Sequence, residues 1–109
     1  MNLRFSPKSV RFRVPQEEFE RLRAERVLQA STRLPGGGAL AYEVRVSGAE
    51  FRLEWKECRM TLYVPEAGLN RIAMSPLKKD SGMEFAISLE DGNVLRVSFE
   101  IDLFKLRRR

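Results

Sequence analysis

The stretch SVRFRVPQEEFERL, residues 9–22, decides the fold, because the spacing of its apolar residues changes at a proline. Before Pro15, apolar and polar residues alternate, which is typical of a β-strand with one buried face. After it, Phe19 and Leu22 follow at plus four and plus seven, the spacing of one face of an α-helix. Proline has a fixed φ and no N–H, and both properties suit the first residue of a helix. The stretch therefore predicts a strand followed by a helix of about ten residues opened by Pro15.

The same pattern recurs fifty residues later, as RMTLYVPEAGLNRI at residues 59–72. Farther along, VRVS at residues 44–47 matches LRVS at residues 95–98, at an offset of 51. Internal repeats of this kind set the architecture of a whole chain. We therefore predict a tandem duplication, with one copy at about residues 1–48 and the other at about residues 49–104.

Each copy is expected to form two strands, a short helix and two more strands. The predicted strands cover residues 2–5, 9–14, 27–34 and 40–46 in the first copy and residues 51–55, 59–64, 83–89 and 94–101 in the second. All alternate apolar with polar residues, which favours antiparallel sheet with one apolar face and one polar face. The predicted class is α+β, a duplicated ββαββ unit with two short helices. Its eight or so mostly antiparallel strands curl into a barrel-like sheet or split into two packed layers.

Positive charge is concentrated at the end of the chain. The 109 residues carry a formal net charge of +5, but residues 1–104 carry only +1. The difference comes from Lys105, Arg107, Arg108 and Arg109. We expect residues 1–104 to form one domain and residues 105–109 a basic tail, whose charges would bind nucleic acid weakly and without sequence preference.

The composition narrows the chemistry. The chain has no histidine, which removes the commonest general base near neutral pH and most zinc and haem sites. Its only cysteine, Cys58, cannot form an internal disulfide and lies in the polar run KECR, which predicts an exposed turn. No apolar run is long enough to span a bilayer. We expect a cytoplasmic protein without cofactor, metal or membrane contact, whose composition favours binding over catalysis.

Residues 2–14 and RLPGGGALAY at residues 33–42 resemble the opening and the mid-chain signature of a family of short uncharacterised bacterial proteins. In that family a hairpin bearing S-x-R-x-R precedes an acidic helix and a hairpin turned by P-G-G. The matching positions here are Ser9, Arg11, Arg13 and residues 35–37. Members often end in a cluster of lysine, aspartate, aromatic residue and cysteine. This chain has Asp102, Phe104 and Lys105 there but no cysteine. The family has no assigned activity, so the resemblance implies no catalytic residue.

Read cyclically, the duplicated unit is also similar to the eight-strand tunnel of the triphosphate tunnel enzymes. Those enzymes carry E-x-E-x-K on an early strand. The corresponding residues here are Arg52, Glu54 and Lys56 in one copy and Asn2, Arg4 and Ser6 in the other. Neither set contains the glutamate pair that holds Mg²⁺ against a phosphate. This resemblance implies an alternative function, a phosphate-ester or triphosphate-binding enzyme.

Arginine is the residue type from which we expect binding. Alternation places Arg4, Arg11 and Arg13 on the polar face of the first hairpin, and Arg45 and Arg96 occupy matched positions on later strands. Guanidinium groups on neighbouring strands can bind a phosphate or a carboxylate through paired hydrogen bonds. The competing interpretation is a solvated face whose arginines pair with acidic residues across the strands. The candidates for that pairing are Glu43, Glu54, Glu100 and Asp102.

Two further patterns give weaker signals. The glycines of residues 35–38 could direct backbone N–H groups at an anion, but an alternating strand follows them, which predicts a hairpin turn. Glu84, Glu100 and Asp102 could bind a divalent cation if neighbouring strands bring them together.

The sequence thus predicts a non-enzymatic binding or assembly module that recognises a protein or a small anionic ligand through its arginine-bearing strands. The alternatives are the phosphate-ester enzyme and the weak nucleic-acid binder. Open sheet edges would favour a homodimer formed by strand pairing, whereas a closed barrel would not.

Overall fold

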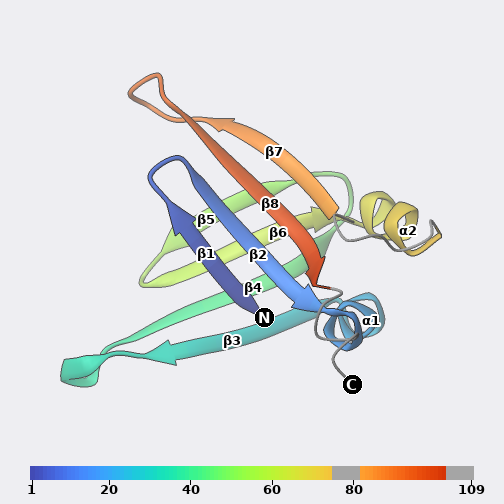
Figure 1. Ribbon diagram of the computed structural model, residues 1–109, viewed down its shortest axis with the longest axis horizontal. Coiled ribbons are helices and arrows are strands. Elements are labelled where there is room, and N and C mark those ends of the chain that lie inside the picture. The colour runs from blue at the N-terminus through green and yellow to red at the C-terminus, as the bar shows by residue number, and fades with distance from the viewer. Residues whose placement is uncertain (75–81, 103–109) are drawn as a thin grey trace. The chain divides into compact units, whose positions relative to one another are not determined.

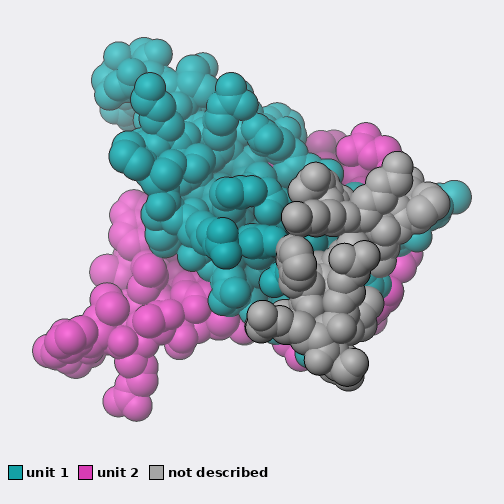
Figure 2. Space-filling model, viewed as in Figure 1, with its two compact units in different colours: residues 1–19, 72–109 teal, residues 20–71 magenta. Residues whose placement is uncertain are grey.

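The computed structural model describes residues 1–74 and 82–102 of the chain. The chain forms two compact units, one from residues 1–19 and 72–109 and the other from residues 20–71 (Figure 2). Each unit holds one four-stranded sheet, named sheet A in the first unit and sheet B in the second.

Sheet A has the strand order β1 (Asn2–Ser6), β2 (Ser9–Pro15), β8 (Val94–Asp102) and β7 (Gly82–Ser88). The hairpins β1–β2 and β7–β8 meet in a parallel pair between β2 and β8 (Figure 1). In that pair Val10 is opposite Val97 and Phe12 is opposite Phe99. These four side chains are 6% exposed or less, so the parallel pair supplies the buried face of sheet A.

Sheet B has the strand order β3 (Val27–Arg33), β4 (Ala39–Ser47), β6 (Arg59–Pro65) and β5 (Arg52–Lys56). Its central pair, β4 with β6, is also parallel and sets Val44 opposite Leu62 and Val46 opposite Val64. The segment η1 (Pro35–Gly37), in which Gly36 and Gly37 have φ of 82° and 83°, connects β3 to β4 as the expected hairpin turn.

The helices α1 (Gln16–Glu25) and α2 (Glu66–Met74) each begin directly after a strand. Pro15 and Pro65 are the last residues of β2 and β6, so each helix begins one residue later than predicted. The difference arises because both prolines still take part in the parallel ladders.

The predicted apolar faces of the helices are buried. Phe19 and Leu22 of α1 and Leu69 and Ile72 of α2 are 6% exposed or less. In the unit of sheet A, the ring centroids of Phe19 and Phe99 are 6.4 Å apart. The unit boundaries fall inside the two helices, so each helix begins in one unit and ends in the other.

The element bounds repeat along the chain with two offsets. β1 and β2 recur fifty residues later as β5 and β6, whereas β3 and β4 recur 55 residues later as β7 and β8. The second offset corrects the predicted match of residues 44–47 with residues 95–98, because the parallel registers align residues 44–47 with residues 99–102. The predicted and observed offsets differ by four, and an alternating pattern is unchanged by any even shift, so the pattern alone could not separate them.

The two halves of the chain exchange their hairpins. Sheet A contains the hairpins β1–β2 and β7–β8, and sheet B contains the hairpins β3–β4 and β5–β6. Four of the six strand pairs are antiparallel, which confirms the mostly antiparallel prediction, but both central pairs are parallel. In the described residues the strands form two four-stranded sheets with two edge strands each, so the closed barrel of the tunnel architecture does not form.

Candidate binding site

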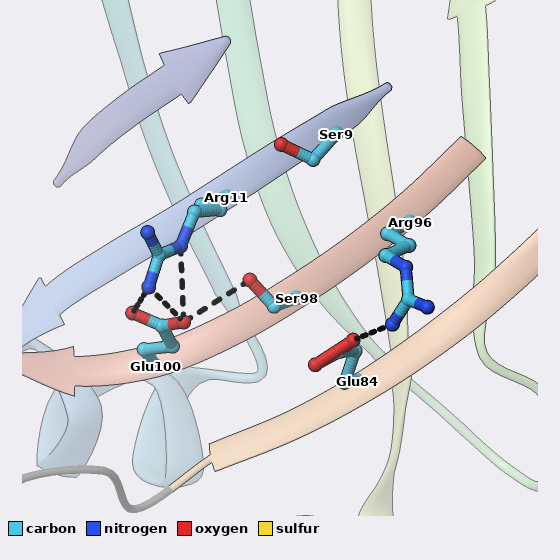
Figure 3. Close-up of a pocket in the computed structure, with 6 residues that line it drawn as sticks. All are labelled: Ser9, Arg11, Glu84, Arg96, Ser98 and Glu100. Carbon is cyan, nitrogen blue, oxygen red and sulfur yellow. Dashed lines mark hydrogen bonds and ion pairs between the residues drawn. The ribbon is translucent and has the colours of Figure 1, made fainter. Parts of the chain in front are cut away.

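The candidate site lies on the polar face of sheet A and is called the A-face site. Its residues are Ser9, Arg11, Glu84, Arg96, Ser98 and Glu100 (Figure 3). They line a depression of about 220 Å³ and come from β2, β7 and β8. On β2 and β8 these side chains alternate with buried apolar residues, because successive residues of a strand point to opposite faces.

Glu100 lies at the centre of a charged network in this site. Arg11 donates hydrogen bonds from Nε and Nη2 to Glu100 Oε2, at 3.2 and 3.1 Å (Figure 3). Ser98 donates from Oγ to the same oxygen at 3.3 Å. Arg13 Nε lies 3.4 Å from Glu100 Oε1, without the geometry of a hydrogen bond. One carboxylate therefore faces two guanidinium groups.

A second ion pair borders the same depression. Arg96 Nη1 lies 3.1 Å from Glu84 Oε2, and the two side chains are 71% and 57% exposed. Exposed pairs of this kind contribute only about 0–1 kcal/mol to stability. The guanidinium of Arg96 can therefore exchange its own carboxylate for one on a ligand at little cost.

Arg4 is the candidate arginine that has no ion-pair partner among residues 1–74 and 82–102. It is exposed on the edge strand β1, directly opposite Arg11 in the antiparallel register. Like charges at opposed positions destabilise a sheet. A carboxylate brought against Arg4 from outside the sheet would offset this repulsion.

Arg45 belongs to a separate charged cluster, which lies on sheet B. Its Nε lies 2.7 Å from Glu43 Oε2, and Arg59 Nη1 lies 2.9 Å from Glu43 Oε1. Thr61 also donates to Glu43, whose side chain is only 4% exposed. Burial acts to raise the pKa of Glu43, but hydrogen bonds from Arg59 and Arg45 outweigh it and hold the pKa below its ordinary value of 4.5. Arg45 is thus committed to a buried carboxylate.

The five predicted arginines are therefore not gathered in one place. The four on sheet A are Arg4, Arg11, Arg13 and Arg96, and Arg45 lies on sheet B. Carboxylates face all of them except Arg4, mainly as the competing interpretation expected. Two pairs depart from that interpretation, because Glu54 lies beside Arg52 and Glu43 lies beside Arg45, each on its own strand.

The proposed divalent cluster does not form. Glu84, Glu100 and Asp102 each face an arginine instead of one another. Within residues 1–74 and 82–102, no three or more histidine, cysteine, aspartate or glutamate side chains are placed to hold a metal ion. The tail residues Lys105, Arg107, Arg108 and Arg109 lie outside the described residues, and nucleic-acid binding through them stays a prediction.

The sequence did not predict that Ser9 and Ser98 line the A-face site. Both depend on the parallel pairing of β2 with β8, which sets Ser9 opposite Arg96 and Arg11 opposite Ser98. The alternation of each strand was visible in the sequence, but the partner strand was not.

The fold and the site define a small α+β protein of two mixed sheets with a charge-paired polar face. The whole chain, residues 1–109, matches the family model described as Family of unknown function (DUF7009). The chain belongs to this family, which confirms the resemblance to an uncharacterised family. No curated protein and no solved structure matches it. In the part of the chain that the structure describes, no helix has the length and apolar character needed to cross a membrane.

Proposed function

We propose that this protein is a non-enzymatic binding module that docks an acidic strand of a partner protein along β1, with Arg4 as the principal contact. The observation that carries the proposal is the position of Arg4. It is an exposed cation with no carboxylate partner among the described residues, and it stands opposite a second arginine on an edge strand.

The edge of sheet A offers the second part of such a contact. β1 has β2 on one side and no neighbour on the other among the described strands. An edge strand presents unpaired N–H and C=O groups that an extended segment can pair with. Backbone pairing supplies affinity without selectivity, and the charge of Arg4 would then select segments that carry a carboxylate at the matching position.

The apolar side of β1 is also accessible. Phe5, on the same strand, is 56% exposed. A partner strand that alternates acidic with apolar residues would therefore meet Arg4 with one face and Phe5 with the other, because strand side chains alternate between faces. This pattern defines the segment that the edge fits best.

The test uses a labelled peptide of alternating valine and glutamate with blocked ends, and fluorescence anisotropy at low and high salt. We expect saturable binding that weakens as salt rises. Arg4→Ala should weaken it about fivefold, which corresponds to about 1 kcal/mol for an exposed ion pair.

Arg33→Ala is the matched control. Arg33 is also an exposed arginine on an edge strand, but on sheet B, and it has no ion pair in the described part of the chain. Its removal should leave peptide binding unchanged. Equal loss of binding in both variants would mean that only the net charge of the protein matters, which contradicts a specific role of Arg4. Absence of binding to the wild-type protein would refute the proposal.

We also propose that the two halves of the chain arose by tandem duplication. The support is the recurrence of strand bounds at constant offsets and the equivalent parallel pair in each sheet.

A further inference from the structure

We infer that the acidic strand that docks on β1 is β5 of a second copy of this chain. The inference rests on the proposed function and names its partner. The contact would extend sheet A of one copy by antiparallel pairing with the edge of sheet B of another.

Charge fixes one register for this pairing. Aligning Arg4 of one copy with Glu54 of the other puts opposite charges together on the polar face. Shifting the alignment by two residues in either direction, which is the smallest shift that keeps the faces matched, puts Arg4 opposite Arg52 or Lys56. Both shifted registers oppose like charges, so only one register is favourable.

The same register matches the apolar faces. It sets Leu3 opposite Trp55 and Phe5 opposite Leu53. Phe5 and Trp55 are 56% and 59% exposed, the most exposed aromatic side chains in the described residues. Cross-strand pairs of aromatic with aliphatic residues stabilise strand pairing. The pairing would therefore cover the apolar surface that each edge leaves in water.

Pairing of like edges is disfavoured by the same rule. Two β1 strands paired antiparallel about their centres would set Arg4 against Arg4. Two β5 strands would set Glu54 against Glu54 and Arg52 against Lys56. Opposed like charges at the central position destabilise both arrangements.

Glu54 is available for a new partner. Its side chain is 47% exposed, and it lies 3.4 Å from Arg52 Nη2 and accepts a hydrogen bond from the Tyr63 hydroxyl at 3.4 Å. A carboxylate offers about four acceptor positions. Arg4 of a second copy can therefore be added without breaking either contact.

The test is a charge exchange followed by sedimentation velocity over a range of protein concentrations. We expect the wild-type protein to self-associate reversibly, and Arg4→Glu and Glu54→Arg each to weaken association about tenfold or more. The double variant Arg4→Glu/Glu54→Arg should regain association. So should an equimolar mixture of the two single variants, because each then meets its opposite charge. Circular dichroism of every variant checks that the fold is kept, and Arg33→Glu serves as the control for net charge.

The outcomes separate this inference from the proposed function. A wild-type protein that stays monomeric yet binds the valine–glutamate peptide through Arg4 would overturn the inference and leave the proposed function standing. Failure of both assays would overturn both. Association that survives both single reversals, or that Glu84→Arg abolishes in place of Glu54→Arg, would show that other strands form the contact.

Discussion

Glu43 shows how a charge is kept inside the polar face of a sheet. Two guanidinium groups and a threonine hydroxyl surround its carboxylate. Because the pKa of Glu43 lies below 4.5 in the folded protein, folding favours the ionised form. The resulting stability is fully present above pH 4.5 and is lost as the pH falls through the folded-state pKa.

Replacing this carboxylate should therefore change both stability and its dependence on pH. We expect Glu43→Gln to lower the free energy of unfolding by about 2 kcal/mol at neutral pH, because it removes charged hydrogen bonds. The difference between variant and wild type should shrink below pH 4.5. Urea unfolding across this range measures both effects. Glu90→Gln is the control, since Glu90 is exposed and in no ion pair within the described residues, and a similar pH response there would contradict the assignment.

Gly82 occupies a position of sheet A that has no room for a side chain. A Cβ there would overlap the carbonyl oxygen of Phe99 and lie 3.1 Å from Glu100 Cα. We expect Gly82→Ala to lower the free energy of unfolding by about 1–3 kcal/mol, because backbone atoms would have to move. Gly48→Ala, where a Cβ would meet nothing within 4 Å, should be neutral or slightly stabilising. Thermal unfolding of both variants makes the comparison, and equal melting temperatures would show that the backbone yields freely.

At the scale of elements, the two equivalent hairpins turn differently. In the β5–β6 turn, Glu57 and Cys58 have φ of 52° and 61°, the left-handed conformation that glycine and asparagine adopt most readily. The β1–β2 turn, at Pro7 and Lys8, has no positive φ. The expectation that Cys58 is exposed in a turn is confirmed. Its turn nevertheless carries two residues poorly suited to it.

The β5–β6 turn should therefore be improved by substitution. We expect Glu57→Asn/Cys58→Gly to raise the free energy of unfolding by about 1–2 kcal/mol, because left-handed backbone costs roughly this much for an ordinary residue. The melting temperature should rise accordingly. Pro7→Asn/Lys8→Gly should give no such gain. If both pairs of substitutions act alike, the difference between the turns does not affect stability.

The elements themselves and the pairing between strands differ in how far they could be predicted from the sequence. The alternation around Pro15 and Pro65 predicted the strands and helices to within a residue or two, because burial of one face imposes its period on the sequence. The choice of partner strand could not be predicted, because the alternation seen in most strands does not mark which strand pairs with which. For that reason Arg11 was correctly placed on a polar face, while its neighbours Ser98 and Glu100 depended on a pairing between distant strands.

For the whole molecule, the exchange of hairpins has a consequence for how the chain folds. Val10 pairs with Val97, which lies 87 residues farther along the chain. During synthesis β2 cannot pair with β8 until residues 94–102 have been made. Contacts of such long sequence separation slow folding, because the loop between them must close before they form. The hairpin β7–β8 therefore completes the sheet that the hairpin β1–β2 begins, after the whole of sheet B has been synthesised.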